Sequence, residues 1–320
     1  SFAGVIFSFS TFIKETPHMK SHGTLLRVCF FCGWLLSFTT QTQAQTALYK
    51  TFESIADSLN GKLGVSVWHL EKGESVSYQG DQKFPMQSTY KFPIAMVMLH
   101  QIDQGHFALS DTITIDTSEY IPAAGHSPLR DQYPKGVCLT LQNIIEYNVS
   151  RSDGTACDVL LRLLGGTAAV EKQLRQLGIQ DMDIATTEKV QVAHDTIQYQ
   201  NGSTPEAMNM LLRLFHEGNY LSKSSQDLLQ QYMSVSNPWF DRRIKSLLPP
   251  GTEVIHKTGS SRTYDGLTRA TNDIGVITLP NGSHLAISVF VSDAYEPQEK
   301  RERAIAEVAK AAYDYWVRRE

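Results

Sequence analysis

The sequence has little of what marks several protein classes. Only 19% of its 320 residues are charged, no run is rich in Lys and Arg, and 42% are hydrophobic. A disordered chain is therefore a poor fit. The formal net charge of -4 offers no broad positive field to a polyanion, so we expect no nucleic-acid partner. None of the ten histidines falls in a spacing such as H-x-H or H-E-x-x-H, so we expect no metal and no other cofactor.

Hydrophobic runs long enough to span a bilayer are also missing. The longest apolar stretch, Val28 to Phe38, follows the charged Met19-Lys20 start and precedes Thr42-Gln43-Ala44. This order is typical of a secretory signal with a small-residue cleavage site, and a buried N-terminal helix is the alternative. We therefore predict an upstream segment or cloning remnant at 1–18, a signal at 19–44 and a mature protein at 45–320. The mature protein should be periplasmic or secreted, monomeric and without a membrane anchor.

Cysteine is scarce as well. Cys29 and Cys32 lie inside the predicted signal and should leave with it. Cys138 and Cys157 remain, and in an oxidising compartment they either pair or stay as two buried thiols.

The hydrophobic pattern predicts a domain whose two ends resemble each other. Helical periodicity at 45–59 is followed by an alternating hairpin at 63–79, and strand-like runs return at 253–256, 267–279 and 284–291 before a last helix from about Pro297. The middle is helical, with helices expected at 92–104, 141–147, 154–164, 168–177 and 205–216. We therefore predict an α/β (α+β) fold in which helices flank an antiparallel sheet built from both chain ends. The sheet subdomain would comprise 45–86 and 234–320, and the all-helical subdomain 87–233.

The stretch Ser88-Thr-Tyr-Lys91 begins an apolar helix. Residues three apart share a helical face, so the Lys91 amine can reach the Ser88 hydroxyl. A serine becomes a nucleophile when a nearby base takes its proton, and burial of an amine lowers its pKa enough for that role. Alone, this spacing is weak evidence, because a chain of this length should contain about one such pair by chance. A surface serine and lysine is the alternative.

Two further motifs follow in order: Ser152-Asp-Gly154 before a helical stretch, and Lys257-Thr258-Gly259 on a strand-like run. Together, the three motifs resemble those of the serine β-lactamases and penicillin-binding proteins. The resemblance covers nearly all of residues 45–320. Glu188 matches the position of the deacylating glutamate in class A β-lactamases, although nothing local distinguishes it from an ordinary loop carboxylate. The segments 87–94 and 271–275 resemble the PER-type, extended-spectrum branch.

The resemblance implies roles for these residues. Ser88 would attack the lactam carbonyl, and the backbone N–H groups of Ser88 and Ser260 would hold the oxyanion. Ser152 would pass a proton to the leaving nitrogen, and Glu188 would activate water against the acyl-serine. Whether Lys91 or Glu188 takes the first proton stays open.

The same resemblance predicts a binding site for the substrate carboxylate. Lys257 would supply positive charge, and Thr258 and Ser260, on either side of Gly259, would supply hydroxyls. Arg243 corresponds to a second cationic group in several class A enzymes, and a surface salt bridge is its alternative.

Two residues depart from the family pattern. Gly154 replaces the usual Asn, so an amide contact to the substrate is absent or supplied elsewhere. Val192 stands where many members have an Asn that holds the hydrolytic water, and Gln87 could take that part. The stretch from Ser260 to Leu267 is also longer than in narrow-spectrum members, which would widen the rim for bulky side chains.

The sequence therefore predicts a serine β-lactamase that acts on penicillins and cephalosporins, including oxyimino-cephalosporins, through an acyl-serine intermediate. The alternatives are a penicillin-binding D,D-peptidase and a non-catalytic β-lactam sensor, both of which lack a deacylating glutamate.

Overall fold

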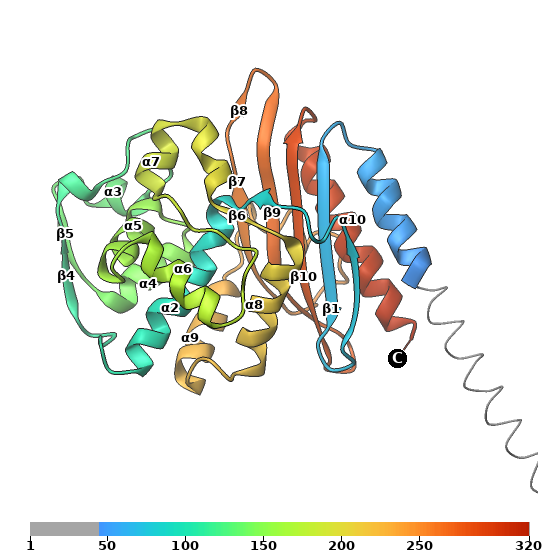
Figure 1. Cartoon of the computed structure of the whole chain (residues 1–320), viewed down its shortest axis with the longest axis horizontal. Coiled ribbons are helices and arrows are strands. Elements are labelled where there is room, and N and C mark those ends of the chain that lie inside the picture. Colours follow the sequence, from blue (N-terminus) through green and yellow to red (C-terminus); the bar gives the residue numbers. More distant parts are fainter. Residues whose placement is uncertain (1–44, 320) are drawn as a thin grey trace, which may run out of the picture. The chain divides into compact units, whose positions relative to one another are not determined.

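A six-stranded antiparallel sheet brings together the two ends of the part of the chain that the structure describes (Figure 1). The computed structural model describes residues 45–319, so the predicted signal and its two cysteines lie outside the described residues. The main path of the sheet has the order β2-β1-β10-β9-β7, and β8 pairs with β9. The strands are β1 (Lys62–His69), β2 (Glu74–Tyr78), β7 (Val254–Ser260), β8 (Thr263–Tyr264), β9 (Leu267–Thr278) and β10 (His284–Ala294).

Strand β10 shows why the sheet is covered on both faces. Leu285, Ile287, Val289 and Val291 belong to one hydrophobic cluster, whereas Phe290 belongs to the other. Because successive strand residues point to opposite faces, each face needs its own cover. The first cluster includes residues of α10 (Gln298–Val317) and of the helix at 45–57, and Figure 1 shows both helices on this side of the sheet.

Helix α8 (Pro205–Glu217) packs against the opposite face of the sheet. Asn209 on α8 donates from Nδ2 to Ala286 O over 3.2 Å and accepts from Ser288 Oγ over 2.6 Å. All three residues are buried, so this contact satisfies polar groups inside the core and fixes α8 against β10.

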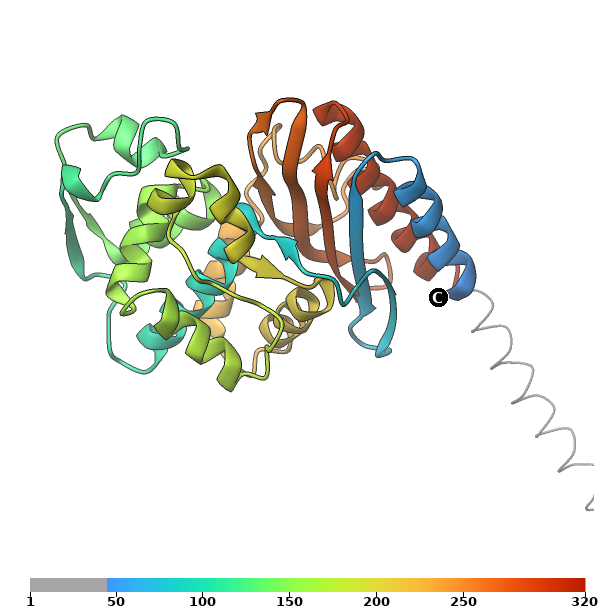
Figure 2. The same cartoon turned by 45° about the horizontal axis from the view of Figure 1, so that its top comes forward.

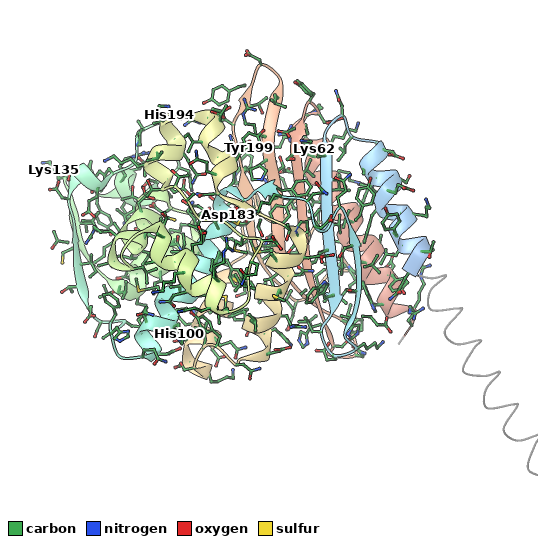
Figure 3. The ribbon with its side chains drawn as sticks, in the orientation of Figure 1. Lys62, His100, Lys135, Asp183, His194 and Tyr199 are labelled. Atoms are coloured by element: carbon green, nitrogen blue, oxygen red, sulfur yellow. The ribbon has the colours of Figure 1, made fainter. Side chains whose placement is uncertain are left out.

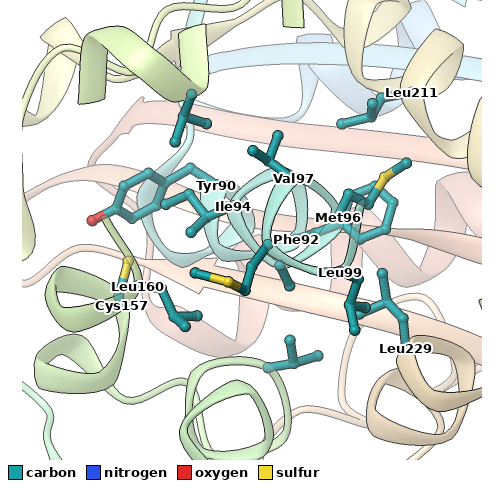
Figure 4. Packing of buried hydrophobic residues seen from close by; sticks show 14 of the residues in the cluster. Tyr90, Phe92, Ile94, Met96, Val97, Leu99, Cys157, Leu160, Leu211 and Leu229 are labelled. Atoms are coloured by element: carbon teal, nitrogen blue, oxygen red, sulfur yellow. The ribbon is translucent and has the colours of Figure 1, made fainter. Parts of the chain in front are cut away.

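Helix α2 (Lys91–Asp103) lies at the centre of the helical part (Figure 2). Every residue from Lys91 to Leu99 is buried, which requires neighbours on all sides. Figure 4 shows Phe92, Met96 and Leu99 packed among side chains from other elements. The helices that pack against α2 are α4 (Leu141–Ser150), α5 (Gly154–Leu163), α6 (Thr167–Gln176) and α9 (Lys223–Met233). Two short helices, α3 (Pro128–Gln132) and α7 (Glu188–Ala193), pack against α5.

The expected helices in the middle of the chain are present within a few residues of their predicted ends. The pattern missed α9, and it missed two small sheets that pair β3 (Phe84–Pro85) with β6 (Gly202–Ser203) and β4 (Thr112–Ile115) with β5 (Val137–Thr140). Each of these strands has only two to four residues, so an alternating pattern of hydrophobic and polar residues cannot be distinguished from loop sequence. They are held by pairing with distant segments.

Two sequence expectations about cysteines and membranes can be compared with the structure. Cys138 is exposed on β5 and Cys157 is buried in α5, and both are free thiols. They are therefore neither a disulfide nor two buried thiols. Within residues 45–319, no helix has the length and apolar character needed to cross a bilayer.

Candidate active site

Ser88 lies on a short helical turn, η1 (Gln87–Tyr90), that leads directly into α2. The Nζ atom of Lys91 donates to Ser88 Oγ over 2.8 Å, as the three-residue spacing predicted. Gln87 has a φ of 47°, a left-handed conformation that is uncommon for a residue with a side chain. Such backbone strain often occurs at active sites.

Glu188 begins α7 and forms an ion pair with Lys91. Lys91 is only 1% exposed. Burial acts to lower the pKa of Lys91, but the Glu188 carboxylate outweighs it and the pKa is raised. The expectation that burial would leave this amine with a lowered pKa is therefore wrong. Lys91 is an ammonium that bridges the hydroxyl of Ser88 and the carboxylate of Glu188.

Lys257 on β7 donates from Nζ to Ser152 Oγ over 2.8 Å. Burial and the nearby positive charge of Lys91 lower the pKa of Lys257 to about 7. Ser152 has a φ of 55° and precedes Asp153, whose carboxylate accepts from Ala156 N and caps α5. The second motif, at Ser152, and the third motif, at Lys257, are therefore in direct contact.

Gly259 allows β7 to approach the turn that carries the nucleophile. A Cβ atom at this position would lie 2.6 Å from Met86 O and 3.1 Å from the backbone nitrogens of Ser88 and Thr89. Only glycine fits this contact without displacing backbone. This close approach places Ser260, at the end of β7, beside Ser88. The backbone N–H groups of these two residues must lie close together if they are to form an oxyanion site.

Arg243 lies behind β7 and is buried. Its guanidinium donates to Gly259 O over 3.0 Å, to Asn272 O over 2.6 Å and to Ser260 Oγ over 2.6 Å. It also pairs with Glu302 at 3.4 Å. Arg243 is therefore not part of a surface salt bridge, and it contacts the predicted Ser260 hydroxyl directly.

The Gln87 side chain donates from Nε2 to Gln198 Oε1 over 2.6 Å. Val192 lines the same cavity as Gln87 and Gln198, and so does Gln191. Gln191 donates from Nε2 to Tyr90 Oη over 3.3 Å, and sequence reasoning had not singled it out. Gln87 and Gln191 thus bring amides to the cavity that contains Val192.

Two cavities meet at the nucleophile. The first has a volume of about 230 Å³ and the second of about 620 Å³. Both are lined by Ser88, His126, Ser152 and Ser260. The first extends past Glu188 to residues of η3 (Asp195–Gln200) and of the β7–β8 segment, namely Asp195, Gln198, Ser261, Arg262 and Tyr264. The second extends past Thr258 to Val235, Trp239 and Phe240.

Gly154 faces the segment that precedes α3. A Cβ atom there would lie 2.6 Å from Ile121 Cδ1, 3.3 Å from His126 O and 3.4 Å from Glu188 Cβ. The Gly154 N–H also donates to His126 O over 3.0 Å. The space for the usual asparagine side chain is therefore taken by the 121–126 segment, and His126 from this segment lines the cleft.

Asp158 on α5 was missed by sequence reasoning. Its carboxylate accepts from the backbone N–H groups of Glu188 and Lys189 over 2.7 and 2.9 Å. Burial and, more weakly, the charge of Glu188 raise the pKa of Asp158 to about 7. In the sequence, the only signal for Asp158 was its position one helical turn after Gly154. The two residues whose N–H groups it accepts lie about thirty positions further along the chain.

The η3 segment is held against the sheet by side-chain contacts that the sequence motifs did not predict. Arg269 on β9 forms an ion pair with Asp195, and Tyr199 donates to Asp293 on β10. Asp293 also accepts from Lys62 Nζ over 3.0 Å. Figure 3 labels Tyr199 and Lys62 at this end of the sheet. These contacts fix one wall of the first cavity.

Comparisons with known proteins agree with this geometry. The model of the beta-lactamase enzyme family matches residues 47–316. Beta-lactamase VEB-1 from Pseudomonas aeruginosa is 38% identical over 83% of this chain and 89% of its own length. Extended-spectrum beta-lactamase PER-1 from the same organism is 36% identical over 89% of this chain and 93% of its own. The crystal structure of TLA-1 extended-spectrum beta-lactamase aligns with a TM-score of 0.83 at 40% identity, over 86% of this chain and 99% of that one. The chain therefore belongs to the β-lactamase enzyme family and is a PER-like class A β-lactamase, an enzyme that hydrolyses β-lactams.

Proposed function

We propose that the enzyme opens β-lactams through an acyl-Ser88 intermediate, that Glu188 drives hydrolysis of this intermediate, and that oxyimino-cephalosporins are among its substrates. One observation carries the proposal: the Lys91 ammonium contacts both Ser88 and Glu188. A nucleophile and a carboxylate joined by one proton carrier are what a cycle of acylation and deacylation needs.

In the acylation step, Ser88 Oγ bonds to the lactam carbonyl carbon and the ring C–N bond breaks. The proton lost by Ser88 is replaced at the leaving nitrogen by one delivered through Ser152. The raised pKa of Lys91 favours Glu188 as the acceptor of the first proton, since an ammonium cannot accept one. The backbone N–H groups of Ser88 and Ser260 would stabilise the oxyanion.

In the deacylation step, a water molecule held by Glu188 attacks the ester carbonyl and releases Ser88. The cavity beside Glu188 is lined by Gln87 and Gln191, whose amides would orient this water in place of the asparagine that Val192 replaces. Without such a water the ester would persist, which is the behaviour of a D,D-peptidase or a sensor.

Substrate binding would rest on β7 and its neighbours. Lys257 would attract the carboxylate of the substrate by its charge, and Thr258 and Ser260 would donate hydroxyl hydrogen bonds. Arg243 is a positioning residue in this proposal, because it is buried and contacts the Ser260 hydroxyl.

Two observations support activity on oxyimino-cephalosporins. The relatives PER-1 and TLA-1 are described as extended-spectrum enzymes. The first cavity also extends from Ser88 between the η3 segment and Ser261, Arg262 and Tyr264. A bulky acylamino side chain would occupy this extension of the cleft.

The test combines turnover with intact-mass analysis. Purified enzyme should hydrolyse nitrocefin continuously and should also turn over ceftazidime and cefotaxime. The variant Glu188→Ala should accumulate an adduct on Ser88, whereas Glu307→Ala, on α10 and outside both cavities, should show the mass and rate of the parent. A single burst from the parent enzyme, or steady hydrolysis by Glu188→Ala, would reject the proposed cycle. Turnover of nitrocefin without the two cephalosporins would reject only the substrate range.

We also propose that the enzyme acts after export, as a monomer in the periplasm or outside the cell. The signal-like segment at 19–44 supports export. Cell fractionation with nitrocefin and gel filtration of the purified enzyme test these two points, and activity confined to the cytoplasm or a dimer mass would contradict them.

A further inference from the structure

A second group of chemically capable side chains lies outside the active site. Glu71 follows β1, His216 lies in the last turn of α8, and His284 begins β10. One carboxylate oxygen of Glu71 and one ring nitrogen from each histidine all lie within 4.8 Å of one another. None of the three residues lines either cavity at Ser88.

The contacts inside this group are close to those of a metal site. His284 Nδ1 lies 2.7 Å from Glu71 Oε1, and His216 Nε2 lies 3.9 Å from the same oxygen. The two imidazole rings have centroids 4.3 Å apart. Ligand atoms on a tetrahedral zinc ion lie roughly 3.3 Å from one another, given metal–ligand distances of about 2 Å. Small rotations of these side chains would therefore close the site.

The group is held in position by its surroundings. The His284 backbone N–H donates to Glu71 Oε2 over 2.8 Å, so both oxygens of Glu71 face the start of β10. Buried His69 accepts at Nδ1 from Lys72 N over 3.2 Å and contacts Ser283 Oγ through Nε2 over 3.2 Å. These contacts fix the turn that carries Glu71. His69 Nδ1 also lies 3.4 Å from Glu71 Oε2, but the His69 side chain is fully buried. Because both of its ring nitrogens already have these partners, we assign His69 to the support of the group.

Solvent reaches the group. The side chains of Glu71, His216 and His284 are 43%, 30% and 28% exposed. His216 and His284 also line a groove between α8, α9 and β7. A hydrated ion could therefore enter, and water could complete its coordination.

We propose that Glu71, His216 and His284 form a binding site for a first-row divalent transition metal ion such as Zn²⁺. Two imidazole nitrogens and one carboxylate oxygen suit these ions, whereas Ca²⁺ and Mg²⁺ prefer oxygen ligands throughout. The ion would bind through a lone pair on each of the two imidazole nitrogens and on the carboxylate oxygen, and no electron is transferred.

The site would act on stability and not on catalysis. The ion would link the β1–β2 turn, the end of α8 and the start of β10, which are distant in the sequence. A ligand that binds only the folded state stabilises it by RT ln(1 + [L]/Kd), so the melting temperature should rise as the concentration of free ion increases. The three ligands come from three separate elements, so no histidine spacing in the sequence could reveal them.

Calorimetric titration of chelator-stripped enzyme with ZnCl₂ tests the proposal directly. We expect one equivalent to bind, and His216→Gln and Glu71→Gln to lose at least about tenfold in affinity, the loss that even an outer partner of a metal ligand costs. His106→Gln is the matched control, because His106 is exposed and contacts Gln101. It should bind zinc like the parent.

A second readout separates coordination from misfolding. Co²⁺ should give a visible absorption band with the parent and with His106→Gln but not with His216→Gln, and Zn²⁺ should raise the melting temperature of the first two only. Nitrocefin turnover should be the same in all three, which shows that the variants are folded. Lack of stoichiometric binding by the parent, or equal affinity in His216→Gln, would overturn the proposal.

Discussion

Lys257 donates a hydrogen bond to Ser152 over 2.8 Å, and this contact joins two motifs that are far apart in the sequence. The lysine is 3% exposed, and burial with the charge of Lys91 lowers the pKa of Lys257 to about 7. Its charge therefore depends on pH within the range in which the enzyme is assayed.

The first prediction concerns this charge. As pH rises through about 7, Lys257 loses its proton in the free enzyme, so kcat/KM for penicillins should fall while kcat changes less. Substrate carboxylate would stabilise the ammonium in the complex, which explains the smaller effect on kcat. Rate profiles from pH 5.5 to 9.5 measure both quantities. Lys257→Arg should move the fall to higher pH, and Lys310→Arg, on α10, should not. A profile of kcat/KM that is flat up to pH 9 would contradict the prediction.

The second prediction concerns the close contact at Gly259. In Gly259→Ala the new Cβ would meet Met86 O at 2.6 Å, so β7 must move away from the turn that carries Ser88. A displacement of about 1 Å at reacting groups can cost about 10²-fold in rate, and we expect a loss of this order in kcat/KM. Gly202→Ala is the control, because its Cβ would find its nearest neighbours at 3.5 Å. Parental kcat/KM in Gly259→Ala would show that the strand has room to adjust.

The residues that sequence could predict are those with a local pattern. Ser88 and Lys91 share a helical face, and the sheet strands alternate, so both the first motif and the fold class follow from short-range periodicity. Glu188 illustrates the limit. Nothing around it in the sequence distinguishes it, and its position was predicted only by family resemblance. The structure brings it to Lys91, with which it forms an ion pair.

Asp158 and Arg243 show why other parts of the site could not be predicted. Asp158 has the sequence surroundings of any helical carboxylate, and its role depends on two N–H groups of another segment. Arg243 was predicted as a cation near the substrate, but its burial and its carbonyl partners depend on how β7 and β9 pack. The pKa of Lys91 was wrongly predicted for the same reason, since the carboxylate that reverses the effect of burial comes from α7.

The third prediction concerns the anchoring of Glu188. Asp158→Ala removes the acceptor for the first N–H groups of α7, so Glu188 should lose its position and deacylation should slow on the order of 10²-fold. Asp158→Asn keeps one acceptor oxygen and should fall in between. Stopped-flow kinetics with intact-mass analysis should show acyl-enzyme accumulating in Asp158→Ala. Asp227→Ala, on α9, should behave like the parent. Because Glu188 is also the proposed acceptor of the first proton, acylation should slow as well. A parental rate of deacylation in Asp158→Ala would contradict the prediction.

The fourth prediction concerns stability and His256, a buried histidine on β7. His256 Nδ1 lies 3.0 Å from Asp273 Oδ2, and His256 Nε2 lies 3.4 Å from Asp241 Oδ1. Burial acts to lower the pKa of His256, but the two carboxylates outweigh it and raise the pKa to about 9. A raised pKa means that this contribution to stability is complete below about pH 6.5 and is lost as pH rises through about 9.

Urea unfolding of the parent and of His256→Gln at pH 6 and pH 9.5 measures this contribution as a difference. The parent should lose about 3 kcal/mol more free energy of unfolding than the variant over this range. The comparison is needed because Lys257, with a lowered pKa, changes stability in the opposite direction over the same range. Its contribution cancels between the two proteins, since both keep this lysine. The same pH dependence in the parent and in His256→Gln would mean that the imidazole is not held as a cation between Asp241 and Asp273.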